Sequence, residues 1–149
     1  MRLEPDYEEL LRSFNKHKVK FCIVGAYALA FHAQPRYTKD MDILIEASTK
    51  NGAKIIKALK DFGFGTLKLS ANDFTKEKQV VQLGYDPVRI DLLTSVEGCT
   101  FKEVWQHKKA GEYGEIKVYF IGRNELIKNK KALSRPQDKV DLELLRKKK

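Results

Sequence analysis

The segment VGAYALAFHAQPRYTKDMDILIE, residues 24–46, is the most informative part of this sequence for predicting the fold. An apolar run ends at a glycine, and a helix-forming segment follows that Pro35 prevents from continuing. A second apolar run then begins with two aspartates. The predicted order is therefore strand, glycine turn, helix and strand.

The apolar patterns along the whole chain predict an α/β (α+β) fold, in which a mixed sheet is flanked by helices in a single domain over residues 1–149. The basic tail at 146–149 is expected to be frayed. Helices are expected at 5–18, 26–33, from Ser48 or Thr49 to 62, 101–109, 124–133 and 136–146. Strands are expected at 20–24, 41–46, 80–85, 88–93 and 116–121, with a short one within 63–69 and a loop at 70–78. The segments 80–85 and 88–93 flank Asp86-Pro87 and are expected to form an antiparallel hairpin.

Composition limits the class of protein. The 149 residues are 42% apolar and 33% charged, which is typical of a globular chain. No apolar run approaches the ~20 residues of a membrane span, and the polar, acidic start is unlike a signal peptide. The two cysteines form no ligand cluster with the three histidines, so we expect reduced thiols in the cytoplasm. A net charge of +9 favours polyanions such as nucleotides or RNA, although lysine-rich surfaces also serve solubility.

Asp40 and Asp42 stand one residue apart where the second apolar run begins. Because alternate residues of a strand share a face, their carboxylates are expected to point together while Met41 points into the core. Two close anions raise each other's pKa unless a cation lies between them, and Mg²⁺ or Mn²⁺ suits carboxylate oxygens best. The D-x-D pair alone is weak evidence, because Asp40 also fits a structural cap.

A third acid, Asp91, lies in the strand-like segment VRIDLL (88–93). If that strand pairs beside the first, three carboxylates meet, and such a group can hold two cations about 4 Å apart, as in phosphoryl transfer. Gly25 opens a helix whose free N–H groups and positive dipole end suit a phosphate. The alternative for Gly25 is an ordinary turn from strand to helix.

The same residues resemble the signature of the DNA polymerase beta-like nucleotidyltransferase superfamily, and especially its small bacterial and archaeal members. In these a Gly-Gly or Gly-Ser turn is followed by a helix and then by D-x-D on a strand. The matching residues here are Gly25, Ala28, His32, Arg36, Thr38, Asp40 and Asp42. The tail LIKNKKALSRPQDKVDLELL (126–145) is similar to the closing segment of those proteins, with matches at Lys130, Arg135, Asp138 and Asp141.

The resemblance implies that Asp40 and Asp42 bind divalent metal, two Mg²⁺ or Mn²⁺ ions, with Asp91 as a base or a further ligand. It implies that Gly25 lets the backbone approach the phosphates of a nucleoside triphosphate, and that Lys130 neutralises them. The remaining residues expected to bind nucleotide are Ala26, Arg36 and Thr38.

Some of these residues have structural alternatives. Arg36 is either a phosphate contact or a loop charge near the acidic pair. Ala26 stands where many members have Gly or Ser, so it offers phosphate its backbone but no hydroxyl. Arg135, Asp138 and Asp141 are spaced i, i+3 and i+6, which favours a salt-bridged helix face over a part in the reaction.

The implied reaction is attack by an acceptor hydroxyl on the α-phosphorus of a nucleoside triphosphate, with pyrophosphate leaving. A protein, an RNA end or a small molecule is the expected acceptor, and the toxin of a toxin–antitoxin pair is one subclass that a basic chain would suit. A chain of 149 residues has little room for an acceptor-binding domain, which leaves that task to a partner protein or a second subunit. The alternatives are a catalytically inactive nucleotide- or RNA-binding module with the same fold, and RNA binding through the basic surface alone.

Overall fold

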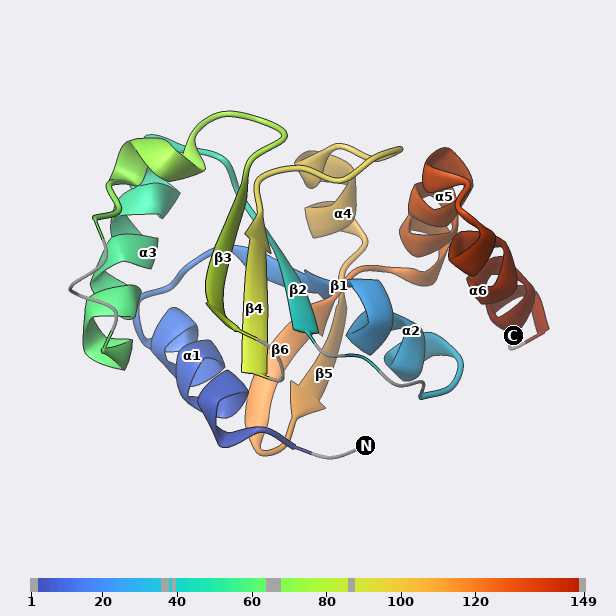
Figure 1. Ribbon diagram of the computed structural model, residues 1–149, viewed down its shortest axis with the longest axis horizontal. Coiled ribbons are helices and arrows are strands. Elements are labelled where there is room, and N and C mark those ends of the chain that lie inside the picture. The colour runs from blue at the N-terminus through green and yellow to red at the C-terminus, as the bar shows by residue number, and fades with distance from the viewer. Residues whose placement is uncertain (1–2, 36–37, 39, 64–67, 86–87, 148–149) are drawn as a thin grey trace.

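A six-stranded mixed sheet forms the centre of the protein, in the order β3-β4-β2-β1-β6-β5 (Figure 1). The computed structural model describes residues 3–35, 38, 40–63, 68–85 and 88–147. The strands are β1 (Phe21–Val24), β2 (Asp40–Ile45), β3 (Val80–Tyr85), β4 (Val88–Leu93), β5 (Lys109–Tyr113) and β6 (Ile116–Phe120). The helices are α1 (Pro5–Lys16), α2 (Gly25–His32), α3 (Thr49–Phe62), η1 (Ala71–Phe74), α4 (Phe101–Gln106), α5 (Arg123–Leu133) and α6 (Pro136–Lys147). The predicted fold class is confirmed.

The middle of the sheet is buried on both faces. All four residues of β1 are buried, because this strand lies between β2, to which it is antiparallel, and β6, to which it is parallel. Strand β2 pairs with β4 in parallel, and this register sets Asp42 opposite Asp91. Strand β3 completes an antiparallel pair with β4, as the sequence predicted.

Apart from α4, the α-helices lie in two groups on opposite sides of the sheet. Figure 1 shows α1 with α3 on one side, and α2, α5 and α6 on the other. Helix α1 buries Leu10, Leu11 and Phe14, and the Ser13 hydroxyl donates to the carbonyl of Ala58 in α3 at 2.9 Å. Ser48 caps α3 by accepting a hydrogen bond from the backbone N–H of Asn51, which confirms one of the two expected caps.

Some details of the predicted secondary structure were wrong, and others fall outside the described residues. The helix predicted over 101–109 ends at Gln106, and residues 109–113 form the unpredicted strand β5. This strand escaped prediction because lysine, alanine and glycine in its first half give little β propensity and only Tyr113 is fully buried. The short strand expected within 63–69 is absent from residues 68–70, and 64–67 lie outside the described residues, as does the Asp86-Pro87 turn. The loop predicted at 70–78 contains η1.

Membrane insertion through a helix finds no support. Among the described residues, none of the helices combines the length and the apolar character that crossing a bilayer would require.

Candidate functional site

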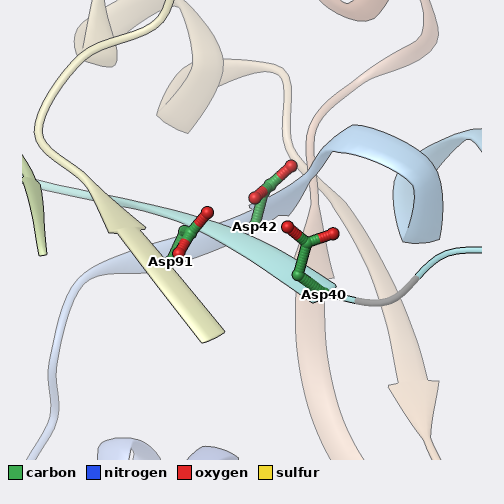
Figure 2. A group of neighbouring side chains, drawn as sticks. All are labelled: Asp40, Asp42 and Asp91. Atoms are coloured by element: carbon green, nitrogen blue, oxygen red, sulfur yellow. The ribbon is translucent and has the colours of Figure 1, made fainter. Parts of the chain in front are cut away.

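Three carboxylates converge on one face of the sheet. Asp40 and Asp42 lie on β2 and Asp91 lies on the neighbouring β4, directly across from Asp42. One oxygen from each carboxylate can be chosen so that all three lie within 4.8 Å of one another, and Figure 2 shows the three side chains side by side. The predicted meeting of three acids is thus observed. A compact set of hard oxygen donors suits Mg²⁺ or Mn²⁺.

Asp42 has a shifted pKa. Burial, followed by the negative charges of Asp40 and Asp91, raises the pKa of Asp42 to about 6. Arg89 and Lys130 act in the opposite direction, because their positive charges favour the ionised form. Asp42 therefore lies where a bound cation would relieve an existing electrostatic cost.

The start of α2 lies against Asp42. Gly25, the first residue of the helix, has φ +66°, and Val24 provides no side-chain cap for the helix N-terminus. A Cβ atom on Gly25 would lie 2.5 Å from Oδ2 of Asp42. Glycine is therefore required here for two reasons: the left-handed backbone and the space that the carboxylate occupies. The backbone N–H groups of the first turn keep their capacity to bind an anion.

A buried ion-pair network joins α5 to α6. Lys130 is only 3% exposed, and its Nζ lies 3.0 Å from Oδ2 of Asp141 and 3.4 Å from Oδ1 of Asp138. Arg135 donates to both carboxylate oxygens of Asp138, through Nε at 2.7 Å and Nη2 at 3.2 Å. These bonds lower the pKa of Asp138 to about 2. The Arg135–Asp138 pair of the predicted salt-bridged face is present, the ion pairs of Lys130 were not predicted, and together they fix two cations beside the cavity that Asp42 lines.

A cavity of about 570 Å³ connects these parts. Of the residues predicted from the sequence, it is lined by Gly25, Ala26, Thr38, Asp40, Asp42 and Lys130. Asp91 is not among the lining residues but lies across from Asp42 in the sheet, and Arg36 lies outside the described residues. A slightly larger cavity, of about 620 Å³, lies beside Asn15, Gly111 and Tyr119 on another part of the surface. We place the functional site in the smaller cavity, because chemistry depends on the convergent charged groups more than on volume.

Thr38 contacts its neighbour within the site. Its hydroxyl donates to the backbone carbonyl of Asp40 at 3.0 Å and lies 3.3 Å from Oδ1 of the same residue. The observed contact orients the carboxylate of Asp40, and nucleotide binding by Thr38 stays a prediction. His32 is held away from the carboxylates: its Nε2 lies 2.6 Å from the carbonyl oxygen of Ile121, and burial lowers its pKa.

Sequence reasoning missed several residues of the site. Ser95, Glu97 and Asn129 line the cavity, and the side-chain amide of Asn129 donates to the carbonyl of Glu97 at 2.9 Å. No sequence motif identifies these residues, because the loop after β4 lies in the site only as a result of its packing against α5. Arg89 was also missed as a partner of the acids, although its place two residues before Asp91 puts both on the same strand face.

Comparisons with known proteins show what this arrangement is similar to. No protein-family model matches the sequence, and a search of curated proteins finds no significant match. A Thermotoga maritima protein described provisionally as a nucleotidyltransferase is 17% identical, with a TM-score of 0.59 over 98% of this chain and 94% of that one. The lincosamide antibiotic adenylyltransferase LnuA, solved with lincomycin, is 13% identical, with a TM-score of 0.54 over 98% of each chain.

A third structure is the enzyme ANT(2″)-Ia in complex with adenylyl-2″-tobramycin. It is 12% identical, with a TM-score of 0.54 over 93% of this chain and 84% of that one. At such identities the likeness concerns the fold, and it extends over at least 93% of this chain and at least 84% of each of the three structures. The chain has the nucleotidyltransferase fold, as its sequence motifs predicted.

Proposed function

We propose that this protein transfers a nucleoside monophosphate from a nucleoside triphosphate to a hydroxyl group of an acceptor. The observation that carries the proposal is the cavity itself. Its lining includes Asp40 and Asp42, with Lys130, Arg135 and the uncapped start of α2. Anionic donors for a metal ion and cationic or N–H groups for phosphate are thus brought together in a space of about 570 Å³, within the usual range for a small-molecule site.

The residues have separate proposed parts. Asp40, Asp42 and Asp91 would hold Mg²⁺ or Mn²⁺, with two ions as the expected number when substrate is bound. A bound divalent cation supplies positive charge against the phosphate oxygens and polarises the phosphorus that is attacked. The backbone N–H groups of Gly25 and Ala26 would bind phosphate, which is why the missing hydroxyl at position 26 is compatible with binding.

Two cations complete the proposed nucleotide site. Lys130 contributes charge from a fixed, buried position, whereas the side chain of Arg135 is 62% exposed and can contact the triphosphate directly. Thr38 would hold Asp40 in place, and Arg36 remains a proposed phosphate contact. These cations offset the charge that builds up on the leaving pyrophosphate.

The reaction follows from this placement. The oxygen of the acceptor hydroxyl forms a bond to the α-phosphorus, the bond from that phosphorus to the bridging oxygen breaks, and pyrophosphate leaves with the electron pair. The hydroxyl proton passes to a carboxylate of the site or to water. ANT(2″)-Ia was solved with an adenylylated aminoglycoside and LnuA with lincomycin, which supports a hydroxyl-bearing acceptor for this fold.

The proposal also covers the cellular compartment of the protein and the molecules that it binds. Cys22 and Cys99 are both free thiols, which supports a reducing compartment such as the cytoplasm. The acceptor remains a protein, an RNA end or a small molecule, bound directly, by a partner protein or by a second subunit.

Calorimetric titration of each of the four ribonucleoside triphosphates, with and without Mg²⁺, tests the proposal. We expect one nucleotide to bind only with Mg²⁺, and Asp42→Asn to abolish that binding. Glu46→Gln is a matched control, because it removes a carboxylate just beyond the same strand, where Glu46 pairs with Lys20 at 3.6 Å. Unchanged binding in Asp42→Asn would refute the site, and binding without turnover on any acceptor would favour the inactive module.

A further inference from the structure

We propose that Arg89 is an internal cation that competes with divalent metal for Asp91, so that the carboxylate site takes up its metal ions in sequence. The inference rests on the proposed function, because it assumes that the three aspartates bind metal. It adds a residue that the sequence motifs do not assign, and it predicts how many ions bind before the nucleotide arrives.

The guanidinium of Arg89 donates a hydrogen bond to each carboxylate oxygen of Asp91. Arg89 Nε lies 3.0 Å from Oδ1 of Asp91, and Nη2 lies 2.9 Å from Oδ2. This is a bidentate pair on a carboxyl group that is only 6% exposed, and such pairs are the strongest of the charge-assisted hydrogen bonds. Both oxygens of Asp91 therefore already accept hydrogen bonds, and a metal ion that uses either oxygen must displace an N–H donor.

The same guanidinium extends toward the other acids. Arg89 Nε lies 3.8 Å from Oδ2 of Asp40, the residue directly opposite Arg89 in the pairing of β2 with β4. Arg89 thus contacts carboxylates on both of the strands that supply the acids. Its charge is directed at the same oxygen atoms that would hold a metal ion.

The backbone of Arg89 is held in place by a residue of helix α1. The hydroxyl of Tyr7, a residue of α1 that is 1% exposed, donates to the carbonyl oxygen of Arg89 at 3.0 Å. The side chain of Arg89 is itself 32% exposed, so its head group can move toward solvent while its Cα stays in place. A fixed base and a partly solvated head group are what an exchangeable counterion needs.

The charges indicate the order of binding. Three carboxylates with one guanidinium carry a net charge of minus two, which one divalent cation at Asp40 and Asp42 neutralises. A second divalent cation would leave the site positive unless further anions came with it. The phosphates of a nucleotide are such anions, and they would also offer the released guanidinium a new bidentate partner.

Manganese titration without nucleotide, followed by electron paramagnetic resonance, tests the inference with no need for an activity assay. We expect the wild-type protein to bind one Mn²⁺ per chain. Arg89→Gln removes the competing charge, so it should bind a second Mn²⁺ or bind the first about tenfold more tightly. Arg89→Lys keeps the charge without the bidentate geometry, and its behaviour should lie between the two.

A purely structural Arg89 would give a different pattern. If Arg89 only held Asp91 in position, Arg89→Gln would bind Mn²⁺ more weakly than the wild type, and that result, or equal binding by both, would overturn the inference while leaving the proposed function intact. Failure of the wild type to bind Mn²⁺ at all would overturn both. Should Arg89→Gln not fold, as judged by circular dichroism, the comparison of wild type with Arg89→Lys decides the question in the same way.

Discussion

The carboxylate of Asp42 occupies the place where a side chain on Gly25 would lie, because Oδ2 is 2.5 Å from the position of that Cβ. The two residues belong to different elements, α2 and β2, and they meet because Val24 pairs with Asp42 across the sheet. The glycine of the turn and the second aspartate of the D-x-D pair thus depend on each other for space as well as for chemistry.

Replacement of Gly25 by alanine should therefore harm the site more than the fold. We expect Gly25→Ala to lose roughly 2–3 kcal/mol of unfolding free energy, from the left-handed backbone and from the displaced carboxylate, and to lose metal-dependent nucleotide binding. Gly63→Ala is the matched control: φ is +104° there and, apart from its chain neighbours, no heavy atom of the described residues lies within 4 Å of the new Cβ, so only the backbone cost of about 1–2 kcal/mol applies. Urea denaturation measures both, and equal losses would show that Asp42 accommodates the methyl group.

The pKa of Asp42 makes a prediction about stability. A carboxyl group with a pKa of about 6 in the folded state and 3.8 when unfolded binds more protons folded than unfolded between these values. The unfolding free energy of the metal-free protein should therefore fall as pH rises from about 4 to about 6. Asp42→Asn should remove this decline and be more stable at pH 7 by roughly 2 kcal/mol.

Thermal unfolding at pH 5 and pH 7.5, in chelator, checks that prediction. Added Mg²⁺ should then raise the midpoint of the wild type at pH 7.5 and leave that of Asp42→Asn almost unchanged. An Asp42→Asn protein that is less stable than the wild type at pH 7.5 would contradict the account of Asp42 as an electrostatic cost to the fold.

Lys130 should be essential for stability. Lys130→Met would leave Asp138 and Asp141, both 0% exposed, without the cation that lies between them. A buried ion pair broken on one side costs about 3–5 kcal/mol, because the buried carboxylates lose a compensating cation. Lys131→Met, next in the same helix and exposed, provides the control and should cost under about 0.5 kcal/mol. Chemical denaturation of both variants distinguishes this view from one in which Lys130 serves nucleotide binding alone.

Replacement of Arg135 should weaken nucleotide binding more than it reduces the stability of the protein. Its side chain is exposed and lines the cavity, so Arg135→Gln should lower the affinity for a nucleoside triphosphate about tenfold while costing only about 1 kcal/mol of stability. The loss should be smaller for the corresponding nucleoside monophosphate, which lacks the β- and γ-phosphates. Lys139→Gln, an exposed cation on α6, controls for net charge, and an equal loss in both variants would reduce the effect of Arg135 to long-range electrostatics.

The parts of the site that the sequence predicted are those set by local periodicity. Alternation along β2 puts Asp40 and Asp42 on one face, and Asp91 required only that the strand at 88–93 pair beside it, which the structure confirms. The tail motif likewise predicted ion pairs around Asp138. What local pattern does not report is the packing between elements distant in the sequence, which brings Lys130 of α5 to both acids of α6.

The residues that sequence reasoning missed depend on such packing. Arg89 stands two residues before Asp91 in the sequence. Its ion pair with Asp40, however, arises only from the register of two strands that lie almost fifty positions apart in the chain. Glu97 and Asn129 meet through a loop and a helix with no motif between them. Strand β5 was missed for another reason, since an edge strand with one fully buried side chain has no alternating apolar pattern to detect.

The ion-pair network of α5 and α6 has a consequence for the protein during its synthesis. The three carboxylates of the sheet and Arg89 are present once residue 91 has been made, but Lys130, Arg135 and the acids that fix them arrive only with residues 130–141. A nascent chain that has not reached Asp141 therefore has the acids of the proposed site without the two cations that α5 and the segment after it supply. On the ribosome, the proposed nucleotide site would be assembled only after residue 141 has been translated.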